Sequence, residues 1–110
     1  MGVTHIVFFQ FKTGTSAETI KDVSSRMLAL KDTCIHPTSQ KPYITASKGG
    51  VDNSKEGLQS GITHAFVVEF SSVDDRDYYV QTDPSHQAFV KSLDGIIGKV
   101  QVIDFTAGVF

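Results

Sequence analysis

Three of the four histidines lie where an imidazole could transfer a proton. His5 and His64 each follow a threonine at the start of an apolar, strand-like segment, and His86 follows Asp83 and Pro84 at the start of a predicted helix. Histidine titrates close to neutral pH, which makes it the most common general acid or base in proteins. These positions therefore indicate acid or base chemistry.

His86 is a candidate general base. It would occupy the third position of its helix, where unpaired amides and the helix dipole disfavour an imidazolium and keep the ring neutral, as a base requires. Asp83 acts in the opposite direction, because a carboxylate at the helix cap could pair with His86 and stabilise its charged form. The sequence leaves open which effect dominates, and whether His86 only completes the helix start.

His5 and His64 have a second interpretation as hydrogen-bonded core residues, because a buried imidazole without partners is costly. A metal site is disfavoured, since no carboxylate or cysteine shares their predicted face and no two histidines have helical i, i+4 spacing. We therefore expect neither a metal nor a cofactor. No nucleotide fingerprint, phosphate loop or Ser/His/Asp set is present either, which argues against hydride transfer, acyl transfer and kinase chemistry.

The two strand-like segments are copies of one pattern. Residues 4–11 (THIVFFQF) and 63–70 (THAFVVEF) align without a gap. Because β-branched and aromatic residues dominate both, we predict two strands. Alternate side chains of a strand share a face. One face would then hold His5, Val7, Phe9, Phe11, His64, Phe66, Val68 and Phe70.

Helices are predicted between the strands. A capping box over Thr15–Glu18 starts the first helix, which carries apolar residues at helical spacing as far as Leu30. A second helix starts after Ser72 and breaks at Asp83–Pro84, where an aspartate cap and a proline begin a third. Further strands are predicted over 43–46 and 100–105. This order indicates an α+β domain with helices on one face of a four-stranded sheet.

The opposite face of the repeated strands is apolar too. Its apolar members are Ile6, Phe8, Ala65 and Val67. The chain's own helices cover only the first face, so a second copy of the same sheet is the simplest cover for this one. We therefore predict a homodimer joined through these four residues, in which two sheets close into a barrel.

Length and composition indicate one domain over residues 1–110. The chain is 40% hydrophobic, with a formal net charge of −2 and no cluster of Lys and Arg that would bind nucleic acid. No apolar run approaches the roughly 20 residues that span a membrane. The N-terminus enters a strand directly, without a signal-peptide pattern, so we expect a cytoplasmic protein. The lone Cys34 excludes an internal disulfide.

Four groups of short motifs follow one another along nearly the whole chain. They are Thr4-His5 with Phe11-Lys12, residues 61–66 with Phe70, residues 83–86 with Phe89, and residues 102–105. Together they resemble the stress-responsive A/B barrel family, which implies a single ferredoxin-like domain with an antiparallel sheet, paired into a dimeric α+β barrel. The family contains a plant polyketide cyclase that makes olivetolic acid, boiling-stable stress proteins and members without known activity, so the resemblance implies the fold more firmly than a reaction.

The resemblance to the cyclase also implies roles for individual residues. His86 matches its general base, Tyr79 or Tyr78 matches the assisting tyrosine, and His5 and His64 match cavity-lining histidines. A cavity between sheet and helices would hold the substrate. The apolar residues expected to line it are Val7, Phe9, Met27, Phe66, Val68 and Phe89.

Two functions follow. The first is a cofactor-independent lyase or cyclase acting on a small polyketide-like or phenolic molecule, in which His86 takes a proton and Tyr79 or Tyr78 hydrogen-bonds the oxygen where negative charge develops. The alternative is a non-catalytic, stress-responsive dimeric barrel that binds a small apolar ligand or acts structurally. The size of the cavity discriminates between them, since a closed core favours the second.

Overall fold

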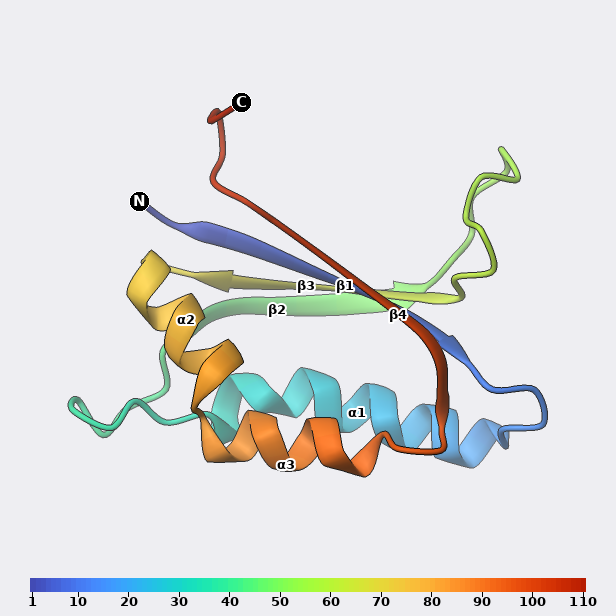
Figure 1. The fold of residues 1–110 in the computed structure, drawn as a ribbon, viewed down its shortest axis with the longest axis horizontal. Coiled ribbons are helices and arrows are strands. Elements are labelled where there is room, and N and C mark those ends of the chain that lie inside the picture. Colours follow the sequence, from blue (N-terminus) through green and yellow to red (C-terminus); the bar gives the residue numbers. More distant parts are fainter.

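The computed structural model describes residues 1–110 as a four-stranded antiparallel sheet with three helices on one face (Figure 1). In chain order the elements are β1 (Val3–Phe11), α1 (Ala17–Thr33), β2 (Ile44–Val51), β3 (His64–Phe70), α2 (Val73–Gln81), α3 (Pro84–Ser92) and β4 (Ile97–Phe105). The strand order is β2-β3-β1-β4. The predicted ferredoxin-like α+β fold is therefore confirmed.

The two copies of the repeated pattern pair with each other. β1 and β3 run antiparallel, with His5 opposite Val68 and His64 opposite Phe9. Both histidines thus point to the helix-covered face, as predicted. Because the copies run in opposite directions, however, His5 and His64 lie at opposite ends of the strand pair.

The helix starts follow the predicted capping chemistry, with one shift. The first cap is Ser16 rather than Thr15, and its Oγ accepts a hydrogen bond from the Thr19 amide at 3.1 Å. Ser72 caps α2 in the same way. Asp83 caps α3 and accepts from the Ser85 amide at 2.9 Å, with proline at the first helical position. These caps satisfy amides that the helices leave unpaired.

β2 is longer than its sequence indicates, reaching Val51 instead of residue 46. The cause lies at Gly49, which would ordinarily mark a strand end. A Cβ there would stand 2.3 Å from Cδ1 of Phe66, so the Phe66 ring occupies the space of the missing side chain. The glycine therefore serves close packing and does not interrupt the strand. β4 likewise begins at Ile97, three residues before its predicted start.

The two faces of the sheet differ in how well they are covered. On the helix side, Phe9, Phe66 and Val68 are each 2% exposed or less, within a core that α1 completes with Val23 and Met27. The other face carries the half-buried residues Ile6, Phe8, Ala65 and Val67, extended on β4 by Ile103 and Phe105, which are 58% and 46% exposed. Only the helix side is thus completed within the chain. None of the three helices has the length and apolar character of a membrane span.

Candidate active site

A cavity of about 750 Å³ lies between the helices and the β1–β4 half of the sheet. Its sixteen lining residues, ten of them hydrophobic, are His5, Val7, Phe9, Met27, Arg76, Asp77, Val80, His86, Phe89, Val90, Leu93, Asp94, Ile97, Val100, Val102 and Asp104. An apolar cavity of this size with a few convergent polar groups is typical of small-molecule sites. The core is therefore not closed on this side.

β4 forms the accessible wall of the cavity. Val100 and Val102 line it, yet they are 56% and 52% exposed, because β4 is an edge strand that α1, α2 and α3 do not fully cover. Across from them, α3 contributes Phe89 and Val90. Apolar side chains on both walls thus remain free to contact a ligand.

His86 is held in one orientation. Its Nδ1 lies 2.8 Å from the carbonyl oxygen of Tyr79. A carbonyl oxygen can only accept, so Nδ1 carries the hydrogen and Nε2 of the neutral ring carries the lone pair. The imidazole also stacks on the Tyr79 ring, with centroids 3.8 Å apart and planes 21° apart. His86 therefore offers the cavity a fixed ring with a free basic nitrogen.

Burial keeps His86 neutral. Its pKa is lowered chiefly because the charged form would lose hydration, and neighbouring His5 adds to this, while the bond to the Tyr79 carbonyl and the charge of Asp83 act in the opposite direction. Asp83 does not pair with the imidazole. Its carboxylate accepts instead from the Ser85 amide at 2.9 Å and from the Tyr43 hydroxyl at 2.5 Å. The competition that the sequence left open is thus decided in favour of the neutral ring.

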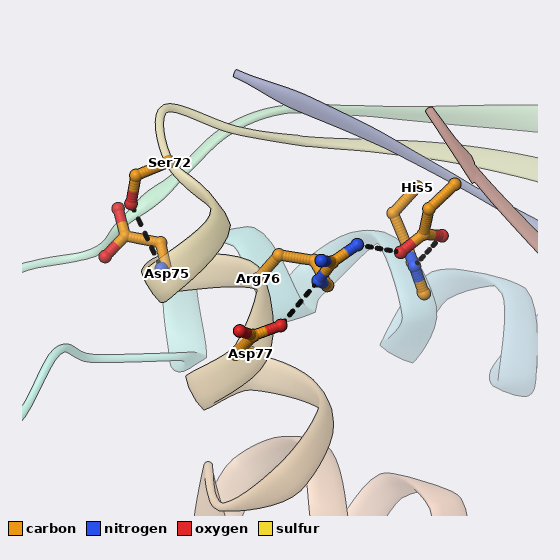
Figure 2. A network of polar contacts seen from close by, with 6 residues as sticks. His5, Ser72, Asp75, Arg76 and Asp77 are labelled. Atoms are coloured by element: carbon orange, nitrogen blue, oxygen red, sulfur yellow. Dashed lines mark hydrogen bonds and ion pairs between the residues drawn. The ribbon is translucent and has the colours of Figure 1, made fainter. Parts of the chain in front are cut away.

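His5 belongs to a row of four side chains joined by hydrogen bonds and ion pairs. Its Nδ1 is 2.6 Å from Oδ1 of Asp104, whose Oδ2 accepts from Nη1 of Arg76 at 2.8 Å, and Nε of Arg76 is 2.8 Å from Asp77. Figure 2 shows Arg76 between Asp77 and the carboxylate that meets His5. His5 is 5% exposed, and its Nε2 makes no hydrogen bond in the protein. A second histidine thus presents a free nitrogen to the cavity.

This row corrects one expectation. The sequence predicts no carboxylate on the face of His5, but Asp104 of β4 lies directly opposite it in the β1–β4 register. The pair is separated by 99 positions in the chain, and sequence alone does not give that register. Asp104 stood in a family motif (residues 102–105), which was the only signal that could have singled it out. No group of three or more His, Cys, Asp or Glu side chains is placed to hold a metal ion.

Neither candidate tyrosine brings its hydroxyl into the cavity lining. Tyr79 is fully buried, and its hydroxyl has no hydrogen-bond partner; burial raises the pKa of this phenol. Its ring instead contacts both histidines, since His5 meets it edge-on with centroids 5.7 Å apart. Tyr78 packs against Tyr43, on another side of α2. The α2 residues that line the cavity are Arg76, Asp77 and Val80.

The remaining expected ligand contacts divide into two groups. Val7, Phe9, Met27 and Phe89 line the cavity, whereas Phe66 and Val68 lie in the closed core beside it. His64 also lies elsewhere, with Nδ1 2.8 Å from Oγ1 of Thr63 and its ring against Phe11. Burial lowers the pKa of His64. The structure therefore gathers His5 and His86 at one cavity and leaves His64 outside it.

Comparisons with known proteins agree with the fold. The family model described as stress responsive A/B barrel domain matches residues 3–107. The Arabidopsis thaliana protein At3g17210 is 30% identical, with a TM-score of 0.83 over 98% of this chain and 97% of its own.

Two further solved structures are similar. The hydroxynitrile lyase from Passiflora edulis is 25% identical, with a TM-score of 0.80 over 99% of this chain and 96% of its own. A dimeric ferredoxin-like protein of unknown function from Thermobifida fusca is 21% identical, with a TM-score of 0.69 over 96% of this chain and 91% of its own. No curated protein matches the chain.

Proposed function

Since the chain belongs to the stress responsive A/B barrel domain family, we propose that it is a cofactor-independent lyase or cyclase acting on a small polyketide-like or phenolic molecule. The observation that carries this proposal is the open apolar cavity at which His5 and His86 both present an unpaired Nε2. The similar protein from Passiflora edulis is a hydroxynitrile lyase, which supports lyase chemistry on this fold.

His86 acts as the general base. Its neutral Nε2 takes a proton from a hydroxyl group or from a carbon between two carbonyls of the bound molecule. In a cleavage the oxygen that loses the proton becomes a carbonyl, and the neighbouring carbon–carbon bond breaks with its electron pair on the leaving group. In a cyclisation the carbanion attacks a second carbonyl carbon. The imidazolium of His86 then returns the proton to the leaving group or to the new alkoxide.

The negative oxygen needs a hydrogen-bond donor, and the tyrosine hydroxyls do not line the cavity. We assign this role to His5 in its protonated form, whose Nδ1–H donates to Asp104 and whose second N–H, on Nε2, is available to the oxygen, since His5 lines the same cavity. Tyr79 contributes through its ring, which His86 stacks on and His5 contacts edge-on. Tyr79 is thus a positioning residue in this mechanism, and Tyr78 lies outside it.

The test is His86→Ala. Turnover of a triketide or tetraketide thioester, or of an aromatic hydroxynitrile, should fall about a hundredfold, because a general base contributes about that much. The melting temperature should fall by only about 4–8 °C, because the lost bond to the Tyr79 carbonyl costs about 1 kcal/mol. Tyr78→Phe is the matched control and should leave turnover unchanged. If His86→Ala lowers the melting temperature while the wild type neither turns over nor binds any of these molecules, the non-catalytic alternative replaces the enzyme.

We also propose that the protein is a homodimer joined through Ile6, Phe8, Ala65 and Val67. This face is apolar and no helix of the chain covers it (Figure 1). The similar protein from Thermobifida fusca is dimeric. A second copy would bury the exposed β4 residues Ile103 and Phe105 at the same time.

Sedimentation at micromolar concentration tests the dimer. Phe8→Asp should abolish it, because the interface would bury an unpaired carboxylate. Leu28→Asp adds the same charge on the outer surface of α1 and should leave the dimer intact. A wild type that sediments as a monomer would contradict the proposal.

A further inference from the structure

The cavity lining has more negatively charged than positively charged side chains. Its lining contains three carboxylates, from Asp77, Asp94 and Asp104, and one guanidinium, from Arg76. The formal charge of the lining is therefore −2, or −1 when His5 is protonated. Arg76 cannot act as a free anion receptor, since its Nε and Nη1 already bind Asp77 and Asp104 at 2.8 Å. Asp94 makes no ion pair.

The excess carboxylates flank the apolar part of the cavity. Asp77 belongs to α2, before α3 begins, and Asp94 lies just beyond the last residue of α3. Between them, the side chains of α3 and of its C-cap that line the cavity are the uncharged His86, Phe89, Val90 and Leu93.

The basic side chains of α1 and α3 that lie on the packed faces or at the end of these helices do not line the cavity. Arg26 is directed to Asp22 at 3.0 Å and to Ser92 at 2.7 Å, outside the lining. Lys91 of α3 is exposed and absent from the lining as well. An anion in the cavity would therefore meet negative charge at both ends and no unpaired cation.

We propose that the cavity selects uncharged or cationic ligands and rejects carboxylates, with Asp94 as a specificity-determining residue. This inference rests on the proposed function and narrows its substrate class to ketones, esters, phenols and amines without a free acid group. The physical cause is repulsion between like charges, which water and salt partly screen because Asp94 is exposed and the Asp77 side chain is 44% exposed.

Three probes with one skeleton separate charge from size. They are 4-propylphenol, which is neutral at pH 7, 4-propylbenzylamine, which is a cation, and 4-propylbenzoate, which is an anion. Both ions lose hydration on entering an apolar cavity, so the ratio of amine affinity to benzoate affinity isolates the sign of the charge. Titration calorimetry of the wild type in about 20 mM salt should give a ratio of about ten, decreasing in 0.5 M salt as screening grows.

Asp94→Asn should lower this ratio severalfold without changing the affinity for 4-propylphenol. Asp32→Asn removes an equal charge from the exposed surface of α1, away from the cavity, and should leave the ratio unchanged. Equal or tighter binding of benzoate would overturn the inference while leaving the proposed function in place. If none of the three probes binds, the small-ligand cavity is itself refuted and the inference fails with it.

Discussion

The two Thr-His strands are similar in sequence, but their histidines have different surroundings in the structure. In β1, His5 is 5% exposed, is bonded to Asp104 and faces the cavity. In β3, His64 is half-buried, is bonded only to the neighbouring Thr63 and lies against Phe11. Equivalent positions in a repeat have thus become a candidate catalytic residue in one copy and a packing residue in the other.

The difference comes from the neighbouring strands. Opposite His5 in the sheet, β4 places Asp104. Opposite His64, β2 places Val51, which is 68% exposed. A carboxylate fixes the ring of a histidine and leaves its second nitrogen free for chemistry, whereas a valine does neither. The repeat therefore gives both histidines the same position in a strand, and the residue on the adjacent edge strand determines which of them has a carboxylate partner.

The largest effect on stability is expected from removing Asp104, the carboxylate that pairs with His5 and has no counterpart beside His64. Asp104→Ala leaves a buried imidazole and the Arg76 guanidinium without their shared carboxylate, so it should cost about 2 kcal/mol of unfolding free energy. Val51→Ala at the equivalent place beside His64 should cost less than about 0.5 kcal/mol, because its side chain is mostly exposed. Urea denaturation of both variants measures this. Equal losses would show that the two ends of the sheet do not differ energetically.

The second effect concerns function. His5→Gln should reduce turnover, or the affinity for 4-propylphenol where no turnover is found, by about tenfold, because a hydrogen bond at the cavity is lost or misplaced. His64→Gln should change either quantity by less than about twofold, since His64 does not line the cavity. If His64→Gln lowered turnover or affinity more than His5→Gln does, the ligand site would have to lie at the His64 end of the sheet.

A smaller effect is expected from pH. Burial lowers the pKa of both His86 and His64 in the folded chain. Below about pH 6.5 the unfolded chain therefore binds protons that the folded chain does not, and the free energy of unfolding falls as the pH decreases; above that value neither state is protonated and the loss vanishes. His86→Gln should remove more of this fall between pH 7 and 5 than His64→Gln, because His86 is the more deeply buried ring. Thermal melts across this range provide the comparison.

The smallest effect tests whether the copies can be made alike. Val51→Asp puts a carboxylate opposite His64, as Asp104 is opposite His5. The new charge should raise the pKa of His64 toward its usual value, only modestly because position 51 is exposed to solvent. Titration of the imidazole protons by NMR detects this shift. An unchanged pKa would mean that sheet register alone does not bring the two groups together.

Local signals predicted most of the fold. Strand and helix order followed from the repeated segments and from the caps at Ser72 and Asp83, since both depend on near neighbours in sequence. The length of β2 did not, because Gly49 is read as a breaker until the ring of Phe66 is known to lie over it.

The site was harder to predict than the fold. His86, His5 and four of the predicted apolar residues do line the cavity. The role of Asp104 could not be predicted, because it depends on the pairing of two strands that are far apart in the sequence. The tyrosine hydroxyls could not be placed either, since the direction of a side chain on the nine-residue helix α2 is set by how that helix packs. Residue types therefore indicated the chemistry, while its partners required the three-dimensional arrangement.

The position of β1 between β3 and β4 has a consequence for the order of folding. β1 is the first of the seven elements in chain order and β4 the last, so one edge of β1 stays unpaired until residues 97–105 pair with it. Pairing over such a separation is slow because a long loop must close before any contact forms. Until it closes, the open edge of β1 can pair with strands of other chains. His5 therefore acquires its carboxylate partner, and the cavity its outer wall, only when β4 pairs with β1.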